Sequence, residues 1–295
     1  MLQRRTTITD NQKQVPKFGF SYSKLSDSLF KKFGDLVYEK TGIFLKSEKK
    51  ELLNARLGKR LRACRIDSFK EYYEYVVNDK SGEEIIQLID SVSTNFTSFF
   101  REEAHFNFLT DTVLPAFAKE GRGGRKDIIF WSAACSSGEE PYTLGMVMEE
   151  FLARQPGVRY RILGTDISTR VLAQANRGVY SDERIAKVPR PLLKKYFQRG
   201  VGKSTGFVKV KESLRSKLAF EHFNLMGQFP WREEIDVIFC RNVMIYFNRE
   251  TQQELISKFY KTLTPGGYLF IGHSESITSL QHGFKQVEAT AYRKP

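Results

Sequence analysis

Small and acidic residues follow two apolar runs of this 295-residue sequence, and their types suit contact with a nucleoside. The segment AACSSGEEP (133–141) follows DIIFWSA, and its small residues allow a backbone to approach a ligand closely. Asp166 ends the next run, YRILGTD, where a carboxylate suits bidentate hydrogen bonding to a ribose diol. Each signal alone has a common alternative, because small-residue turns are frequent in α/β proteins and Asp166 could cap a helix. Their conjunction favours a nucleoside site.

The 133–141 segment lacks the G-x-G-x-x-G pattern that a pyrophosphate requires. An adenosine cofactor without phosphates therefore fits better than a dinucleotide. S-adenosylmethionine is the predicted cofactor.

The segment STNFTSFFRE (93–102) combines polar and aromatic residues in an unusual way. Asn95, Thr97 and Arg101 recur at steps of two and four, with phenylalanines between them. A solvent-exposed linker has little use for the phenylalanines, and a core helix has little use for the polar groups. The segment could also begin a helix, with Thr97 or Ser98 as its cap.

After about residue 125, short apolar runs alternate with helical patterns. This alternation predicts βαβ units and a mostly parallel sheet with helices on both faces. The last two strands are predicted to form an antiparallel edge pair. Residues 181–217 interrupt the alternation and predict a small inserted β subdomain with a hairpin. The predicted strands are 127–133, 160–166, 217–223, 236–240, 267–272 and 284–292.

The first 92 residues predict a different architecture. Residues 1–20 are polar and aperiodic and are expected to be a disordered tail, whereas residues 21–92 predict a small all-helical domain. In one of its helices Leu53, Leu57 and Leu61 form a buried stripe. A basic ridge lies away from that stripe and consists of Arg56, Lys59 and Arg62.

The formal net charge of +13 is concentrated in two regions. Residues 46–65 hold eight cationic and two acidic side chains, and residues 187–217 hold ten and one. Such regions indicate an acidic partner, either nucleic acid or protein, although a solvated surface is the plain alternative. The three cysteines lack metal-ligand spacing, and no signal peptide or 18-residue apolar run is evident. We expect a cytoplasmic monomer without membrane insertion.

Several motifs occur together in an order and spacing that resembles the CheR family of chemotaxis receptor glutamate methyltransferases. They are STNFTSFFRE, WSAACSSGEEPYTL, GTDIS, FNL, IFCRNVMIYF and LTPGGYLFIGHSES. The resemblance covers roughly residues 23–292. It implies a Rossmann-like class I methyltransferase domain (93–295, including the linker) after the helical domain. It also implies S-adenosylmethionine as the donor, S-adenosylhomocysteine as the product, and a receptor glutamate as the acceptor.

The resemblance implies roles for particular residues. Arg101 is expected near the transferred methyl group, where it would hold the incoming carboxylate. Tyr246 is expected either to donate to the same carboxylate or to pack beside the methyl group. The phenylalanines of 93–102 are expected to pack against both domains. Glu140 is an alternative to its neighbour Glu139. The expected cofactor-binding residues are Asn95, Thr97, Arg101, Glu139, Asp166, Asn224, Leu225, Arg241 and Asn242.

Methyl transfer to a carboxylate needs neither a general base nor a metal, because a glutamate with a pKa of about 4.3 is already ionised at neutral pH. The four histidines form no clustered ligand set in the sequence, and His273 is expected to be structural.

The expected partner is the acidic helical bundle of a methyl-accepting chemotaxis receptor. The Arg56, Lys59 and Arg62 ridge would dock on it. The β subdomain would bind a C-terminal tether peptide of the receptor by strand addition.

Two rival functions are a nucleic-acid methyltransferase and a non-enzymatic adaptor. The first is disfavoured because CRNVMIYF stands where base amino-methylating enzymes carry an N-P-P-Y-like turn, and because Cys135 and Cys240 lack the context of a base-methylating nucleophile. The adaptor is disfavoured because a pocket without catalytic activity need not keep Asn95, Arg101 and Asp166.

Overall fold

The N-terminal domain consists of helices, as the sequence predicts. The computed structural model describes residues 24–295 except 125 and 233, so the predicted tail 1–20 lies outside the described residues. Ser26 caps the first helix by accepting a hydrogen bond from the Leu29 amide, and Gly42 ends it in the left-handed conformation. Leu53, Leu57 and Leu61 are buried in the core of this domain. Its elements are α1 (Asp27–Thr41), η1 (Ser47–Lys49), α2 (Lys50–Cys64), α3 (Phe69–Asn78) and α4 (Glu83–Val92).

The second domain contains a seven-stranded sheet in the order β6-β2-β1-β7-β8-β10-β9. The first five strands of that order are parallel, and β10 is antiparallel to both of its neighbours. The predicted α/β fold, with a mostly parallel sheet after a helical domain, is confirmed. The strands are β1 (Ile128–Ala133), β2 (Tyr160–Asp166), β6 (Leu218–His222), β7 (Ile235–Cys240), β8 (Leu263–Ile271), β9 (Lys285–Glu288) and β10 (Ala291–Arg293).

The C-terminal edge differs from the prediction in one respect. Residues 284–292 form two short strands and not one, because the chain turns at Ala289 and Thr290. The Glu288 carboxylate accepts a hydrogen bond from the Ala289 amide, which stabilises that turn. As a result β10, and not β9, pairs with β8.

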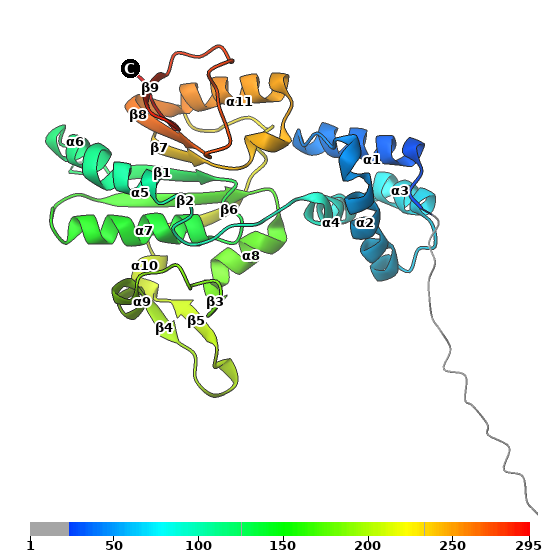
Figure 1. The fold of residues 1–295 in the computed structure, drawn as a ribbon, viewed down its shortest axis with the longest axis horizontal. Helices are drawn as coiled ribbons and strands as arrows, with labels where there is room; N and C mark the ends of the chain where they lie inside the picture. Colours follow the sequence, from blue (N-terminus) through cyan, green and yellow to red (C-terminus); the bar gives the residue numbers. More distant parts are fainter. Residues whose placement is uncertain (1–23, 125, 233) are drawn as a thin grey trace, which may run out of the picture.

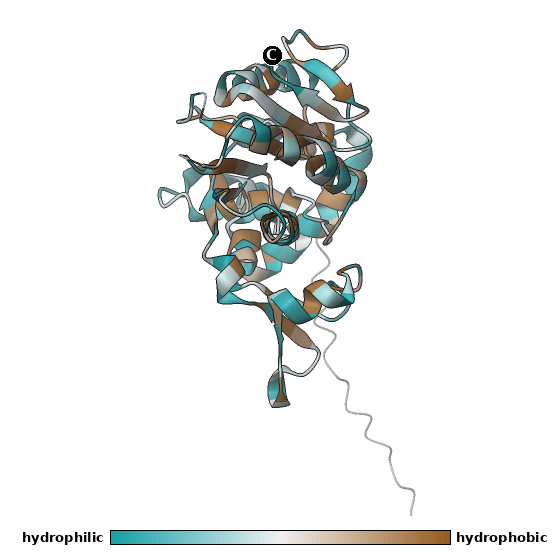
Figure 2. Cartoon of the chain, turned by 90° about the vertical axis from the view of Figure 1, so that its left-hand side faces the viewer, coloured by the Kyte–Doolittle hydropathy of each residue, from teal (hydrophilic) through white to brown (hydrophobic). Residues whose placement is uncertain are grey.

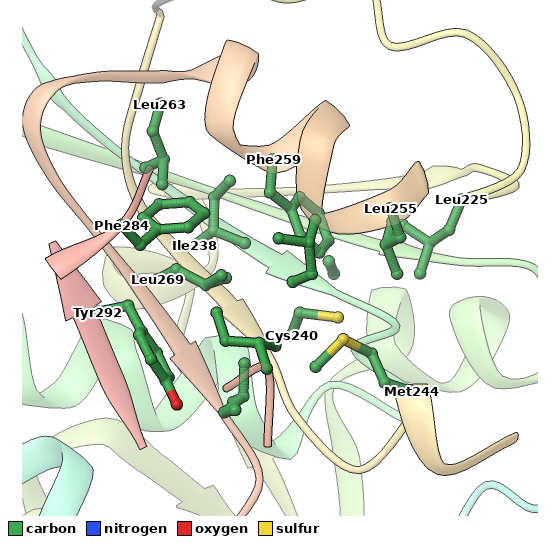
Figure 3. Close-up of a cluster of buried hydrophobic side chains, with 14 of the residues drawn as sticks. Leu225, Ile238, Cys240, Met244, Leu255, Phe259, Leu263, Leu269, Phe284 and Tyr292 are labelled. Carbon is green, nitrogen blue, oxygen red and sulfur yellow. The ribbon is translucent and has the colours of Figure 1, made fainter. Parts of the chain in front are cut away.

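Helices cover both faces of the sheet (Figure 1). Alternate residues of each strand enter opposite layers, as the pleat requires: Phe239 packs with α5 and α7, whereas Ile238 and Cys240 pack with α11. Figure 3 shows the α11 layer, and Figure 2 shows that apolar residues concentrate along the strands. The helices of this domain outside the β subdomain are α5 (Ala104–Phe108), a π-helical turn (Leu109–Val113), α6 (Leu114–Lys119), α7 (Glu139–Leu152), α8 (Thr169–Arg177), the 3₁₀ turn η4 (Met244–Tyr246) and α11 (Arg249–Thr262).

The predicted β subdomain is a three-stranded antiparallel sheet in the order β3-β5-β4. It begins at Val179, slightly before the expected boundary, and β4 and β5 form the predicted hairpin. In Figure 1 it lies below α7. Its elements are β3 (Val179–Ser181), α9 (Arg190–Tyr196), β4 (Phe197–Arg199), η3 (Gly202–Ser204), β5 (Phe207–Val210) and α10 (Glu212–Arg215).

The two domains contact each other through backbone and side-chain hydrogen bonds. Ile43 forms an isolated antiparallel bridge with Phe247, and the Phe44 amide donates to the Tyr246 carbonyl at 2.8 Å. Because η4 directly follows β7, this contact brings the helical domain to the carboxyl end of the sheet. Among the helices of the described residues, none has the length and apolarity needed to cross a membrane.

Candidate active site

A cavity of about 360 Å³ lies where the helical domain meets the carboxyl ends of the strands. This volume is within the range of small-molecule sites, and open α/β sheets bind ligands at this edge. The linker between the domains forms one wall. The polar side chains that line it include Arg56, Asn95, Thr97, Arg101, Ser136, Glu140, Asp166, Asn224, Arg241, Asn242 and Tyr246.

The loop after β1 is held in a strained shape. Ala134, Ser136 and Gly138 have φ values of 63°, 50° and 93°, in the left-handed region that L side chains rarely adopt. A Cβ atom on Gly138 would lie 2.8 Å from the Cβ of Ala175, so only glycine fits there. This shape turns the loop sharply between β1 and α7, at the cavity wall.

Asp166 stabilises the strained loop from the end of β2. One carboxylate oxygen accepts from the Ser136 amide at 2.8 Å, and the other accepts from the Ser168 amide at 2.9 Å. Burial raises the pKa of Asp166, while these backbone hydrogen bonds act in the opposite direction. Each carboxylate oxygen can accept a second hydrogen bond, so contact with a ligand diol remains open. The N-cap of α8 is Ser168, whose side chain accepts from Val171, and not Asp166.

The linker lies along the cavity without regular secondary structure at residues 93–98 and with turns at 99–103, so it does not begin a helix at Thr97 or Ser98. The Asn95 carbonyl accepts from the Ser136 hydroxyl at 2.8 Å. The Asn95 Nδ2 atom is buried and has no hydrogen-bond partner among the described residues. A buried amide donor without a partner is costly, so a ligand acceptor would stabilise it.

The linker phenylalanines do not act alike. Phe99 is fully buried and packs edge-on against Tyr180 and Phe197 of the β subdomain, which agrees with the expected packing role. Phe96, in contrast, is 76% exposed at the cavity mouth, which corrects the expectation that it packs between domains. Its carbonyl accepts from Arg101 at 3.0 Å, and the guanidinium lies over its ring.

A buried guanidinium connects three segments at the inner end of the linker. Arg241, directly after β7, lies 2.9 Å from both Glu102 and Glu140 and donates to the Arg101 carbonyl. Phe100 and Glu102 have φ values of 52° and 57°, so the chain around Arg101 is also strained. Burial acts to raise the pKa of Glu102. The Arg241 charge and the hydrogen bonds that Arg241, Asn242 and the His273 amide donate together outweigh burial and lower this pKa.

Comparison with known protein families shows to which family the chain belongs. Residues 28–93 match the all-alpha domain of CheR methyltransferase, and residues 95–293 match its S-adenosylmethionine-binding domain. The chain belongs to the CheR methyltransferase family. It is therefore an S-adenosylmethionine-dependent methyltransferase.

Curated relatives of this CheR protein match over most of their length. The chemotaxis protein methyltransferase of Escherichia coli K12 is 37% identical over 269 residues, which cover 91% of each chain. The protein of the same name from Borreliella burgdorferi is 39% identical over 88% of this chain and 92% of its own. Chemotaxis protein methyltransferase 2 of Pseudomonas aeruginosa is 37% identical over 94% and 96%.

In this CheR protein, the cavity brings together every predicted site residue of the catalytic domain except one. Glu139 does not line it: its carboxylate is fully buried, 2.6 Å from Arg184, and accepts from the Ser137 hydroxyl. Burial raises the pKa of Glu139, although Arg184 opposes this. Glu140 lines the cavity instead, because successive helical residues project in different directions. The expectation for Glu139 is corrected accordingly.

Asn224 and Leu225 line the cavity but have other contacts as well. The Asn224 amide donates to the Lys40 carbonyl at 2.7 Å, and its oxygen accepts from the Met226 amide. Leu225 belongs to the apolar layer under α11 (Figure 3). Asn224 therefore also holds the helical domain at the site.

Two acidic residues that hold the cavity lining in place were not predicted as site residues. Glu102 lies within the quoted motif STNFTSFFRE, and Glu275 lies within GHSES, yet neither motif revealed what the carboxylate contacts. Glu275 accepts from the Gly272 and Asn242 amides at 2.6 and 2.9 Å, and so holds Asn242 in its left-handed conformation. Burial raises the pKa of Glu275 in spite of these hydrogen bonds.

The predicted basic ridge is divided in the structure. Lys59 and Arg62 are exposed on α2. Arg56 is half-buried and donates to the Val92 and Ser93 carbonyls at 2.6 and 3.1 Å, which fixes the start of the linker. The structure therefore differs from a ridge of three free cations.

The fold gathers three possible metal ligands that are distant in the sequence. One ligand atom each from Glu102, His105 and His273 lies within 4.8 Å of the others. Burial, followed by the Arg241 charge, lowers the pKa of His105 to about 3. Because Arg241 also neutralises Glu102, the local charge opposes a bound cation.

Proposed function

We propose that this protein transfers a methyl group from S-adenosylmethionine to the γ-carboxylate of glutamates in chemoreceptor helices, which makes it a protein-glutamate O-methyltransferase. The observation that carries the proposal is that one cavity joins the strand ends to the face of the helical domain, with Arg101 in its lining. The names of the curated relatives supply the chemotaxis context.

The residues present fit S-adenosylmethionine. The unpartnered Asn95 amide, the strained loop at Ser136 and the Asp166 carboxylate form a polar wall around a cavity of suitable volume. Asp166 would hold the ribose and Asn95 another polar group. When bound, S-adenosylmethionine supplies an electrophilic methyl group on a sulfonium centre.

The acceptor needs orientation more than activation. A glutamate with a pKa of about 4.3 is ionised at neutral pH, so the chain does not have to remove a proton from it. One Arg101 nitrogen donates to the Phe96 carbonyl, and the remaining donors can fork onto a carboxylate. Tyr246 lines the same cavity and offers a hydroxyl donor. A cation weakens the nucleophile that it holds, so the gain from orientation must exceed that loss.

We infer that docking uses exposed cations of the helical domain and an edge of the β subdomain. Lys59 and Arg62 are exposed and suit an acidic receptor helix. Strands β3 and β4 are the edges of their sheet, and either could add a strand from a receptor tether peptide. Titration of the whole protein with a C-terminal receptor peptide tests the tether, and absence of binding would exclude it.

The test of the proposed function is chemical. The protein is incubated with tritiated S-adenosylmethionine and membranes that contain chemoreceptors, and the products are treated briefly with alkali. Label that enters the receptor and leaves as volatile methanol identifies a carboxyl methyl ester. Label that survives alkali, or enters nucleic acid only, overturns the proposal. Cofactor binding without any transfer would favour an adaptor.

A further inference from the structure

Exposed apolar side chains gather at the mouth of the cavity. Ten large apolar residues are exposed among the described residues, and four of them line this cavity. They come from four separate segments, so no sequence pattern accounts for the cluster. We name this set the apolar collar; it consists of Phe44, Leu52, Phe96 and Ile245, which are 52%, 41%, 76% and 46% exposed.

We propose that the apolar collar binds the apolar residues one helical turn on either side of the acceptor glutamate, on an acidic substrate helix. The inference rests on the proposed function and names what that site recognises. Scattered exposed apolar residues are ordinary, but a cluster around a ligand cavity marks an interaction site.

The position of the collar separates it from the cofactor-binding wall. Ser136 and Asp166 are buried, whereas the collar residues are exposed. A side chain that enters the cavity from solvent must therefore pass the collar. The collar lies where the chain that carries the acceptor would rest.

Helix geometry indicates which substrate residues meet the collar. A helix is about 10–12 Å wide with its side chains, and residues three and four positions apart lie on one face. If one residue on that face enters the cavity, its neighbours one turn away lie against the rim. Apolar neighbours would bury the collar, while charged ones would lose their hydration.

Positive charge at the cavity mouth indicates that the rest of the substrate helix is acidic. Lys46 and Lys49 line the cavity and are exposed, and neither pairs with a carboxylate within the described part of the chain. They complement acidic residues elsewhere on the helix. The recognised surface is therefore an acidic helix with apolar positions beside the acceptor.

Steady-state methylation of a receptor cytoplasmic fragment tests the collar. We expect Leu52→Asn and Ile245→Asn each to raise KM for the fragment about tenfold, with kcat and S-adenosylhomocysteine affinity unchanged within about twofold. Val77→Asn is the matched control, because Val77 is exposed in the same helical domain but does not line the cavity. It should leave KM unchanged.

A double-mutant cycle tests contact directly. Asparagine replaces the apolar fragment residues one turn from the acceptor, and each fragment is paired with each collar variant. Direct contact predicts that the combined rise in KM is smaller than the product of the single effects. Four outcomes would each overturn the proposed role of the collar. They are independent effects of the two sets of substitutions on KM, an unchanged KM, a loss of cofactor affinity, and a change in oligomeric state alone. If the unaltered protein forms no ester, the proposed function fails and the collar with it, whereas normal ester formation with unchanged KM overturns the collar only.

Discussion

Arg241 and Glu102 form a buried ion pair at 2.9 Å although 139 positions separate them in the chain. The same guanidinium reaches Glu140 at the start of α7 and the carbonyl of Arg101. One side chain after β7 thus joins the linker to the sheet and to a helix. The wall of the cavity that carries Arg101 depends on this pair.

Removing Arg241 should destabilise the protein. Arg241→Met leaves the Glu102 and Glu140 carboxylates buried without their shared partner, so we expect the free energy of unfolding to fall by about 3 kcal/mol. Urea unfolding followed by circular dichroism measures the change. Lys40→Met removes the exposed pair with Glu39 and should cost less than about 1 kcal/mol. Equal losses in the two variants would contradict the structural role of Arg241.

We expect Arg101 to increase the turnover number for methyl transfer. Arg101→Ala removes the fork that orients the acceptor carboxylate, and we expect kcat for ester formation to fall about a hundredfold. Arg101→Lys should recover only part of that rate, because an ammonium cannot bind both oxygens in one plane. The exposed Arg154→Ala serves as the control. Unchanged turnover together with unchanged cofactor affinity in Arg101→Ala would refute the assignment.

We expect Asn95 to contribute to the affinity for the cofactor. Its buried amide has no protein partner among the described residues, so we expect it to donate to the bound cofactor. Asn95→Ala should weaken S-adenosylhomocysteine binding about tenfold, as isothermal titration calorimetry would measure. The exposed Asn78→Ala should bind normally. Equal affinities for the two variants would remove Asn95 from the cofactor site.

The helical domain should show a pH dependence that originates at Glu84. Arg60 donates to both oxygens of this buried carboxylate at 2.6 Å, and Tyr72 donates to one at 2.7 Å. Burial by itself would raise the pKa of Glu84. The hydrogen bonds and the charge of these partners outweigh burial, so the pKa lies below the usual value of 4.5. The stabilisation is therefore fully present above about pH 5 and is lost as the pH falls through the folded-state pKa.

Glu84→Gln tests this dependence. At pH 7 we expect the free energy of unfolding to fall by about 2 kcal/mol. The difference from the unaltered protein should narrow below about pH 4, because Glu84 is then increasingly protonated in the unaltered protein as well. Denaturant unfolding at several pH values measures it. A difference that is constant from pH 7 to pH 3.5 would contradict the sign of the shift.

Local patterns and motifs were enough to predict the architecture and many of the polar residues that line the cavity. Alternating apolar runs, each bounded by turns, predict the strands because burial on both faces demands them. The carboxyl ends of parallel strands share one edge of a sheet, so Asp166 could be assigned to a ligand site without coordinates. The resemblance to CheR added Asn224 and Arg241, and the linker residues Asn95, Thr97 and Arg101.

Only the tertiary structure decided what each side chain faces. The sequence offers Glu139 and Glu140 as neighbours, but the direction in which α7 begins sends one to Arg184 and the other to Arg241. In the basic ridge on α2, Arg56 is bound to the carbonyls at the start of the linker. The apolar collar combines residues of the helical domain with Phe96 and Ile245, which are distant in the sequence. These outcomes depend on contacts between residues far apart in the chain. Helical and strand periodicity constrain near neighbours only, and therefore could not reveal them.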